Sequence, residues 1–324
     1  MATQTQLKWL ALGATGLLGA ASLFWQKHEK RGRGLLLSPS QGSLVDAART
    51  LNRGAGLLAF SVALDSAMEH YRGDFQNRAM YTPLLTASLS LLASGHGQQD
   101  HSARANRLRH AIYLGAGASG LVGTGLHLYN VTKRAGGWSW SNLFYAAPLG
   151  APSALVLSGL LGYYAERLRD ASGDMRPQVF GLPAGEAVAV MAAGGLLGTV
   201  AEVALLHFRG SFQNPAMYLP VVAPPAAAGL LVGTVLAGPK YSRLRWLSRL
   251  WLRFTTFMGL AGAGFHAFGI ARNHGGWGNW RQNLLAGPPL PAPPSFTGLA
   301  LAGLAAHTLL DEENYRSRDR RRLS

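Results

Sequence analysis

A segment of fourteen residues occurs twice in this chain, and this duplication limits the possible folds more than any other feature. The first copy runs from His70 to Pro83 and the second from His207 to Pro220. Ten of the fourteen positions are identical, and the two copies align without a gap. Because a repeat of this kind reflects one structural unit used more than once, the sequence predicts two related halves.

A second motif is also repeated. Gly-x-Gly-x-His ends at His127 in the first half and at His266 in the second, and each copy is followed at the same spacing by Gly-Gly-Trp. The rest of the two halves has diverged, so the retained residues need a structural or functional reason.

Nine predominantly apolar segments, separated by polar stretches, follow one another along the chain. They are Trp9–Trp25, Leu57–Met68, Tyr81–Ser94, Ala111–Tyr129, Leu149–Tyr164, Ala187–Phe208, Tyr218–Ala237, Trp251–Ile270 and Phe296–Leu310. A transmembrane helix needs about 20 residues, and flanking residues extend the shorter segments. With 48% apolar and 14% charged residues, the chain is predicted to be an all-α polytopic membrane protein with about nine transmembrane helices. The alternative is a soluble helical bundle.

The basic residues are distributed unevenly between the two sides of this predicted membrane protein. The net charge of +15 would also suit a nucleic-acid-binding protein. The number of Lys and Arg residues, however, alternates from one connection to the next. The first, third, fifth and seventh connections and the tail have six, three, three, five and five, whereas the second, fourth, sixth and eighth connections have two, two, one and two. Because basic loops remain in the cytoplasm, we expect the N-terminus outside, the C-terminus in the cytoplasm and no nucleic-acid partner. The basic loops would contact the anionic inner leaflet of a cell membrane, such as a bacterial inner membrane.

The segments also predict the division of the chain. Residues 1–50 would form an N-terminal membrane anchor with a basic cytoplasmic connection, and residues 51–168 a first four-helix repeat. Residues 169–183 would form a linker, residues 184–310 a second four-helix repeat, and residues 311–324 a charged cytoplasmic tail. The basic residues follow the first apolar segment, which favours a retained anchor over a cleaved signal peptide. The chain has no cysteine, which excludes disulfides, iron–sulfur clusters and haem attached through cysteine.

Two polar connections have predicted roles of their own. Residues 95–110 are expected to form a loop in which His96, His101 and His110 are solvated, because the second half has no counterpart of these histidines. Residues 238–253 alternate basic and apolar side chains and are expected to form an amphipathic helix at the membrane surface.

The parity of the spans predicts where the repeated residues meet. Each repeat has an even number of spans, so both copies enter the membrane in the same direction. The histidines of both motifs would then end outward-running helices at one depth on the non-cytoplasmic side.

Part of the first motif suits local structure alone. Glycine favours the left-handed end of a helix, asparagine caps the start of the next helix, and proline suits its first turn. These roles are predicted for Gly73, Gly210, Asn77, Asn214, Pro83 and Pro220. The tryptophans near the second motif suit the aromatic belt at a membrane surface.

The four repeated histidines are candidate cofactor ligands. In an up-down-up-down bundle the first and third helices are diagonal neighbours, so His70 would face His127, and His207 would face His266. Two facing imidazoles are the axial ligands of a b-type haem. The alternative is a hydrogen-bonding role in the structure.

Glycines and arginines near the histidines fit the same hypothesis. Gly123 and Gly262 lie one helical turn before the second histidine of each half and would leave room for a macrocycle, although they suit close helix packing equally well. Arg72 and Arg209 would pair with haem propionates, since a guanidinium matches a carboxylate.

Two acidic residues within the apolar spans are further candidates. Asp65 and Glu202 each precede a histidine of the first motif by five residues, and such residues are costly in a membrane and often functional. They lie about 140° around the helix from that histidine. They are therefore expected to face another helix, carry protons or pair with an arginine. Copper or zinc bound by two to four of the histidines is the alternative metal site.

The leading functional hypothesis is electron transfer by haem b in each half, to or from a quinone or a periplasmic redox partner. The protein would then be an electron carrier and not a stand-alone catalyst. The first alternative is a transporter or binding module for a small anion, in which Arg72 or Arg209 joins a polar outer cluster. Its other members are Gln76, Asn77, Gln213, Asn214, Asp65 and Glu202. The second alternative is a structural or assembly subunit without a cofactor.

Overall fold

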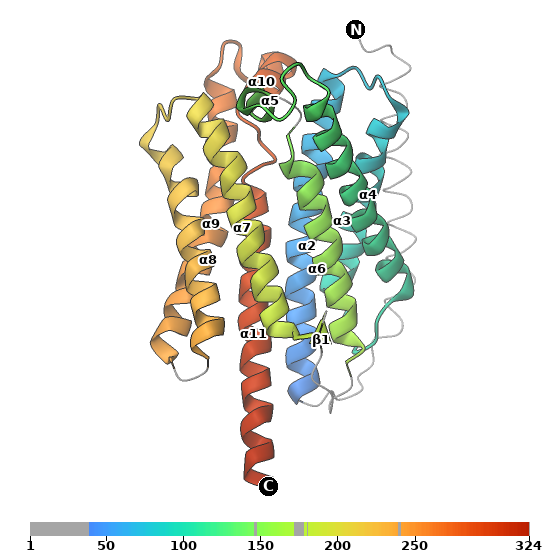
Figure 1. The fold of residues 1–324 in the computed structure, drawn as a ribbon, viewed down its shortest axis with the longest axis vertical. Coiled ribbons are helices and arrows are strands. Elements are labelled where there is room, and N and C mark those ends of the chain that lie inside the picture. Colours follow the sequence, from blue (N-terminus) through green and yellow to red (C-terminus); the bar gives the residue numbers. More distant parts are fainter. Residues whose placement is uncertain (1–38, 146–147, 172–177, 180, 239–240, 324) are drawn as a thin grey trace.

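A computed structural model describes residues 39–145, 148–171, 178–179, 181–238 and 241–323. The predicted N-terminal anchor and most of its basic connection, residues 1–38, lie outside the described residues. The described chain is nearly all helical, which confirms the predicted all-α class. Its long helices run side by side along a common direction (Figure 1).

Four long helices form a first bundle. They are α2 (Pro39–Arg72), α3 (Thr82–Gln99), α4 (Arg107–Thr132) and α6 (Gly150–Arg169). Each helix packs on the next, and α6 closes the ring against α2. Helices α2 and α4 are therefore diagonal to each other. Leu51, Leu58, Tyr113 and Leu161 are fully buried between the helices.

Four more long helices form a second bundle with the same order of contacts. They are α7 (Ala184–Arg209), α8 (Leu219–Ala237), α9 (Ser242–Arg272) and α11 (Pro294–Leu323). Helix α11 closes this ring against α7, so α7 and α9 are diagonal.

The two bundles meet where α2 contacts α11 and α6 contacts α7. Two glycines allow the first of these contacts. A Cβ atom on Gly54 would come within 2.7 Å of the Gly298 carbonyl oxygen, and a Cβ atom on Gly298 within 2.8 Å of the Gly54 carbonyl oxygen. The backbones approach this closely because neither residue has a side chain.

Short elements distinguish the two ends of the molecule. The connections between long helices contain η1 (Arg78–Tyr81), α5 (Trp140–Tyr145), η2 (Pro215–Tyr218), η3 (Gly276–Asn279) and α10 (Trp280–Ala286). Figure 1 shows α5 and α10 together at one end, which we call the motif end. At the opposite end, the strand end, β1 (Gln178–Val179) pairs antiparallel with β2 (Leu182–Pro183) between α6 and α7.

Three described helical segments are long and apolar enough to cross a membrane. They are Ala184–Arg209, Pro215–Ala237 and Ser242–Arg272. On α9 the large apolar side chains of Phe257, Leu260 and Phe268 are exposed, as expected for a surface that faces lipid. These findings support a membrane protein.

Three predicted boundaries differ from the structure. Helix α2 begins at Pro39, so the end of the predicted basic connection is helical. The loop predicted at residues 95–110 is shorter, because α3 continues to Gln99 and α4 begins at Arg107. The predicted surface helix at 238–253 is not a separate element. Its helical part is the start of α9, and its Arg245 and Arg249 are ion-paired with Asp311 of α11, a partner that sequence spacing did not reveal.

Candidate functional site

The first motif forms the same turn in both bundles. The Asn77 side chain accepts a hydrogen bond from the Ala79 backbone N–H at 2.9 Å and caps η1, and the Asn214 side chain caps η2 through Ala216 at the same distance. Pro83 and Pro220 lie in the first turn of α3 and α8. The predicted local roles of the asparagines and prolines are therefore confirmed.

The left-handed residues of the turn are not the glycines that the sequence predicted. Asp74, Phe75, Ser211 and Phe212 have φ values of 53°, 47°, 56° and 44°, whereas φ of Gly210 is −82°. Gly73 and Gly210 instead make space, since a Cβ atom on either one would lie 3.2 Å from the methyl group of Met80 or Met217. A phenylalanine with positive φ is strained, so the surrounding contacts must hold these turns in place.

Aromatic stacking supplies part of that support. The ring of Phe75 stacks on Tyr81 with centroids 4.4 Å apart, and Phe212 stacks on Tyr218 at 4.5 Å. The same phenylalanines meet His70 and His207 edge-on, with centroids 6.1 Å apart in both halves. Each histidine therefore has its orientation fixed on one side by an aromatic ring.

All four histidines hydrogen-bond through Nδ1 to a backbone carbonyl. In the first motif the acceptors are Met80 O for His70, at 2.6 Å, and Met217 O for His207, at 2.8 Å. In the second motif they are Pro148 O for His127, at 2.6 Å, and Pro289 O for His266, at 2.8 Å. A carbonyl only accepts, so Nδ1 carries a proton, and in the neutral imidazole the lone pair is then on Nε2, as in a metal-ligating histidine.

The histidines form two pairs, one in each bundle. His70 lies in the last turn of α2, and His127 lies near the end of the diagonal helix α4. The same holds for His207 on α7 and His266 on α9. Each imidazole is partly buried. The diagonal positions of the helices agree with the sequence prediction, and the facing of the two imidazoles stays a prediction.

Two asparagines that were not among the predicted site residues hold the second motif. Asn142 Nδ2 donates to the carbonyls of Ala135 and Gly137, at 3.1 and 2.8 Å. Asn283 Nδ2 donates to His274 and Gly276 in the same way, at 3.1 and 2.7 Å. The second half has two more residues than the first between the histidine of this motif and Asn283. After this insertion the two halves align again, with Asn-Leu at 142 and 283 and Pro-Leu-x-Ala-Pro beginning at 148 and 289. Alignment with a gap would have found both residues.

The repeated glycines of the second motif face prolines. A Cβ atom on Gly123 would lie 3.2 Å from the Pro152 side chain, and one on Gly262 would lie 2.9 Å from Pro293. The space beside these glycines is thus occupied by Pro152 in the first turn of α6 or by Pro293 directly before α11. Of the two predicted roles of Gly123 and Gly262, close helix packing explains this geometry. The other role, making space for a macrocycle, does not.

The predicted arginines already contact protein groups. Arg72 forms an ion pair with Glu69 at 2.6 Å. The guanidinium of Arg209 lies over the ring of Tyr145 on α5, 5.4 Å from its centroid. Gln76 and Gln213 are exposed beside these residues. The polar outer cluster was predicted once in each half, and in each half its asparagine caps the short helix η1 or η2.

Asp65 lies on α2 of the first bundle, and Glu202 lies on α7 of the second. Glu202 Oε1 accepts a hydrogen bond from the Gly150 backbone N–H at 3.3 Å, which places this side chain at the N-terminus of α6. For Glu202 this contact agrees with one of the expected roles, facing another helix, whereas the role of Asp65 stays a prediction.

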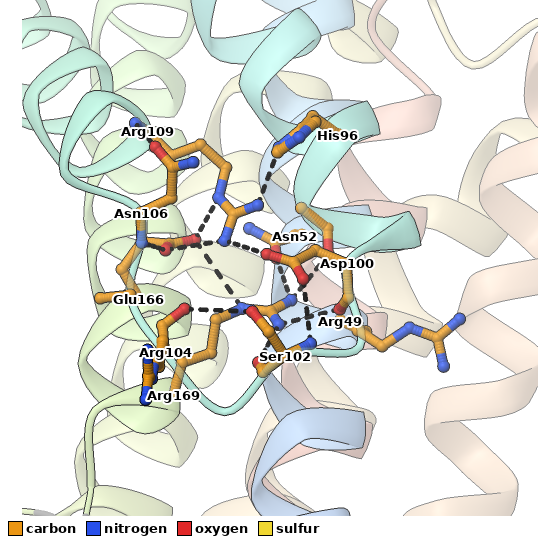
Figure 2. Close-up of polar contacts among 12 residues, drawn as sticks. Arg49, Asn52, His96, Asp100, Ser102, Arg104, Asn106, Arg109, Glu166 and Arg169 are labelled. Atoms are coloured by element: carbon orange, nitrogen blue, oxygen red, sulfur yellow. Dashed lines mark hydrogen bonds and ion pairs between the residues drawn. The ribbon is translucent and has the colours of Figure 1, made fainter. Parts of the chain in front are cut away.

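A buried ionic network at the strand end was not predicted (Figure 2). Arg109 donates from Nε to Glu166 Oε1 at 2.8 Å, pairs with Asp100 at 2.8 Å and contacts His96 Nδ1 at 2.8 Å. Arg169 donates to the carbonyls of Gly97, Asp100 and Ser102. The side chains of Arg109, Glu166 and Arg169 are all fully buried. The network ties the α3–α4 loop to α6.

This network corrects the prediction for the loop histidines. His96 is partly buried and bound to Arg109, so it is not a solvated loop residue. The ring of His110 packs edge-on against Tyr163, with centroids 4.7 Å apart. His101 is exposed, as predicted.

Within the described residues, three or more His, Asp or Glu side chains do not gather at any point in a way that would hold a bare metal ion. Comparisons with protein families, with curated proteins and with solved structures found no match to this chain.

Proposed function

We propose that this protein is a membrane electron carrier that binds non-covalent haem b between two histidines in each bundle. The observation that carries the proposal is the common state of the four histidines. Each one gives its Nδ1 proton to a backbone carbonyl and keeps the lone pair of Nε2. Each also has a second repeated histidine on the diagonal helix of its own bundle.

A pair of imidazoles suits haem better than a bare metal ion. The macrocycle supplies four ligands to haem iron, so the protein needs to provide only the axial two. Zinc usually takes three or four ligands from the protein. When bound, the haem would supply one-electron redox chemistry. The chain's own part is to orient the imidazoles through the carbonyls of Met80, Pro148, Met217 and Pro289.

The same proposal includes the membrane arrangement. The chain would cross the membrane about nine times as an anchor and two four-helix repeats, with the motif end outside and the tail in the cytoplasm. The three apolar helices support this view, as do Arg245 and Arg249 at the start of α9. The cell membrane of a bacterium, with its anionic inner leaflet, is the proposed location. A quinone or a periplasmic redox protein is the proposed partner.

The absorption spectrum of the purified protein tests the proposal. We expect a Soret band, sharp bands on reduction with dithionite, and a haem b product in pyridine-alkali, all after extraction in mild detergent. Absence of the Soret band and of iron, in protein that is folded by circular dichroism and was expressed with added haem precursor, would contradict the proposal. It would then favour the structural subunit.

A further inference from the structure

A groove of about 610 Å³ opens at the motif end, between α5 of the first bundle and the α7–η2 turn of the second. It is lined by Tyr145, Phe208, Arg209, Ser211, Phe212 and Tyr218. Its volume lies in the range of small-molecule sites, about 300–1,000 Å³.

The lining combines flat apolar surfaces with hydrogen-bond donors. Four of the six residues are aromatic, and the stacked rings of Phe212 and Tyr218 lie only 13° from parallel. Arg209 and Ser211 add a guanidinium and a hydroxyl group, which donate hydrogen bonds. A planar ring that carries oxygen acceptors matches both properties, because it stacks on the aromatic rings and accepts from the donors.

The position of the groove indicates that its ligand comes from the membrane. Phe208 and Arg209 are the last residues of one candidate membrane span, and Tyr218 lies near the start of the next. The aromatic side chains of Tyr145, Phe208 and Tyr218 are exposed there. A ring with a lipid-soluble tail would enter such a groove from the bilayer. A small soluble anion would not stack on its four aromatic residues.

The groove also adjoins the second histidine pair. Phe212 lines the groove, and its ring centroid lies 6.1 Å from that of His207. A ring bound in the groove would therefore be one side chain away from the imidazole. We propose that this groove binds the head group of a membrane quinone. The role in electron exchange rests on the proposed function above, whereas binding requires only the groove.

The first bundle offers a matched control, because the equivalent turn has different chemistry. Arg72 is the counterpart of Arg209, and it forms an ion pair with Glu69. In the second half, Leu206 occupies the position equivalent to Glu69. Asp74 replaces Ser211, and its carboxylate would repel a quinone oxygen. The ring of Tyr71 is covered by Arg281 of α10, 5.7 Å from its centroid. We therefore expect one quinone site per chain.

Titration of the purified full-length protein with a decyl-benzoquinone, followed by calorimetry, tests this inference. We expect one site per chain in the wild type. Kd should rise about tenfold or more in Arg209→Gln, because a charged hydrogen bond is lost. Tyr145→Leu should also weaken binding, and Arg72→Gln should stay within about twofold of wild type. Thermal unfolding of each variant checks that it is folded. If Tyr145→Leu does not fold, Arg209→Gln alone is sufficient to test the inference.

Four results would overturn the inference. The first two are unchanged quinone binding in Arg209→Gln and a loss of quinone affinity in Arg72→Gln as large as that in Arg209→Gln. The third is that a sulfonated naphthoquinone without a tail binds as tightly as the decyl compound. The fourth is that Arg209→Gln loses haem while its quinone affinity is unchanged. Failure of the proposed function is distinguishable. A protein without a Soret band that still binds the decyl compound through Arg209 would retain the groove and reject the haem.

Discussion

Glu166 accepts hydrogen bonds from three groups, Arg109 Nε at 2.8 Å, Arg109 Nη2 at 2.9 Å and the Asn106 backbone N–H at 2.7 Å. Both side chains of this ion pair are 0% exposed. Removing Glu166 would leave Arg109 with Asp100 as its remaining carboxylate partner, and breaking a buried ion pair costs about 3–5 kcal/mol. At the scale of single residues, the strand end therefore depends on this pair.

We predict that Glu166→Gln lowers the free energy of unfolding by about 3 kcal/mol. The variant Arg107→Gln is a suitable control, because Arg107 is exposed on the same turn of α4. Unfolding in detergent, followed by circular dichroism, measures both. Equal stability of Glu166→Gln and Arg107→Gln would show that the buried pair contributes nothing.

Asp100 gives the strand end a predicted pH dependence. Burial raises the pKa of Asp100, but the Ser102 backbone N–H and the Arg109 guanidinium outweigh burial and bring the pKa down to about 2, from 3.8. The carboxylate therefore stabilises the folded state fully above about pH 5. About 2 kcal/mol is lost as the pH falls from 4 through 2.

The variant Asp100→Asn isolates this contribution. The stability difference between wild type and Asp100→Asn should shrink by about 2 kcal/mol between pH 5 and pH 2. Chemical unfolding at the two pH values measures it. A difference that does not change with pH would mean that the Asp100 pKa is not lowered.

Single residues differed in how far the sequence could predict them. The capping asparagines were predictable because a cap depends on neighbours in sequence. Glu166 was not, since it meets Arg109 across 57 positions and the second half has Ser248 and His307 in place of this pair. Arg109 also looked like one more basic loop residue. The left-handed Phe75 and Phe212 were missed because propensity assigns positive φ to glycine.

At the scale of helices, glycines decide how closely α9 and α11 pack. A Cβ atom on Gly259 would lie 2.4 Å from Thr297 Oγ1 and 2.8 Å from the carbonyl oxygen of Pro293. Thr297 belongs to the facing helix α11 and Pro293 immediately precedes it, so relieving the contact with the Pro293 carbonyl would separate α11 from α9. A Cβ atom on Gly264, in the same helix, would meet nothing within 4 Å.

We predict opposite effects for alanine at these two positions. Gly259→Ala should destabilise the protein by about 1–3 kcal/mol, because overpacking displaces backbone. Gly264→Ala should be neutral or stabilise it by up to about 1 kcal/mol, because alanine favours the helix. Thermal midpoints in detergent measure both. A stable Gly259→Ala would place α9 and α11 farther apart than in this structure.

The helices themselves were largely predictable from apolar segments, and their partners were not. All eight apolar segments outside the undescribed N-terminal residues overlap one long helix each. Hydropathy, however, did not indicate that α2 meets α11 through Gly54 and Gly298. A glycine shows that something approaches closely, and it does not identify the partner.

At the scale of the whole molecule, the motif end and the strand end should lie on opposite sides of a membrane. The chain has no cysteine, so a single introduced thiol reports its own location. Gln76 and Gln99 are both exposed, the first in the turn at the motif end and the second at the last residue of α3.

We predict that a membrane-impermeant maleimide labels Gln76→Cys in intact cells, because the proposed orientation places that turn outside. Gln99→Cys should be labelled only after permeabilisation. Gln213→Cys, in the equivalent turn of the second half, should behave like Gln76→Cys. Labelling of Gln99→Cys but not of Gln76→Cys in intact cells would reverse the orientation, and labelling of Gln76→Cys and Gln213→Cys from opposite sides would contradict two parallel repeats.

The haem content of single histidine variants tests the central claim most directly. His70→Ala and His127→Ala should each remove the haem of the first bundle, and His207→Ala and His266→Ala that of the second. Each variant should thus retain about half of the wild-type haem per chain, because independent sites do not affect each other. His101→Ala, which changes an exposed histidine, should retain all of it. Full haem content in the four variants, or complete loss in any one of them, would contradict two separate bis-histidine sites.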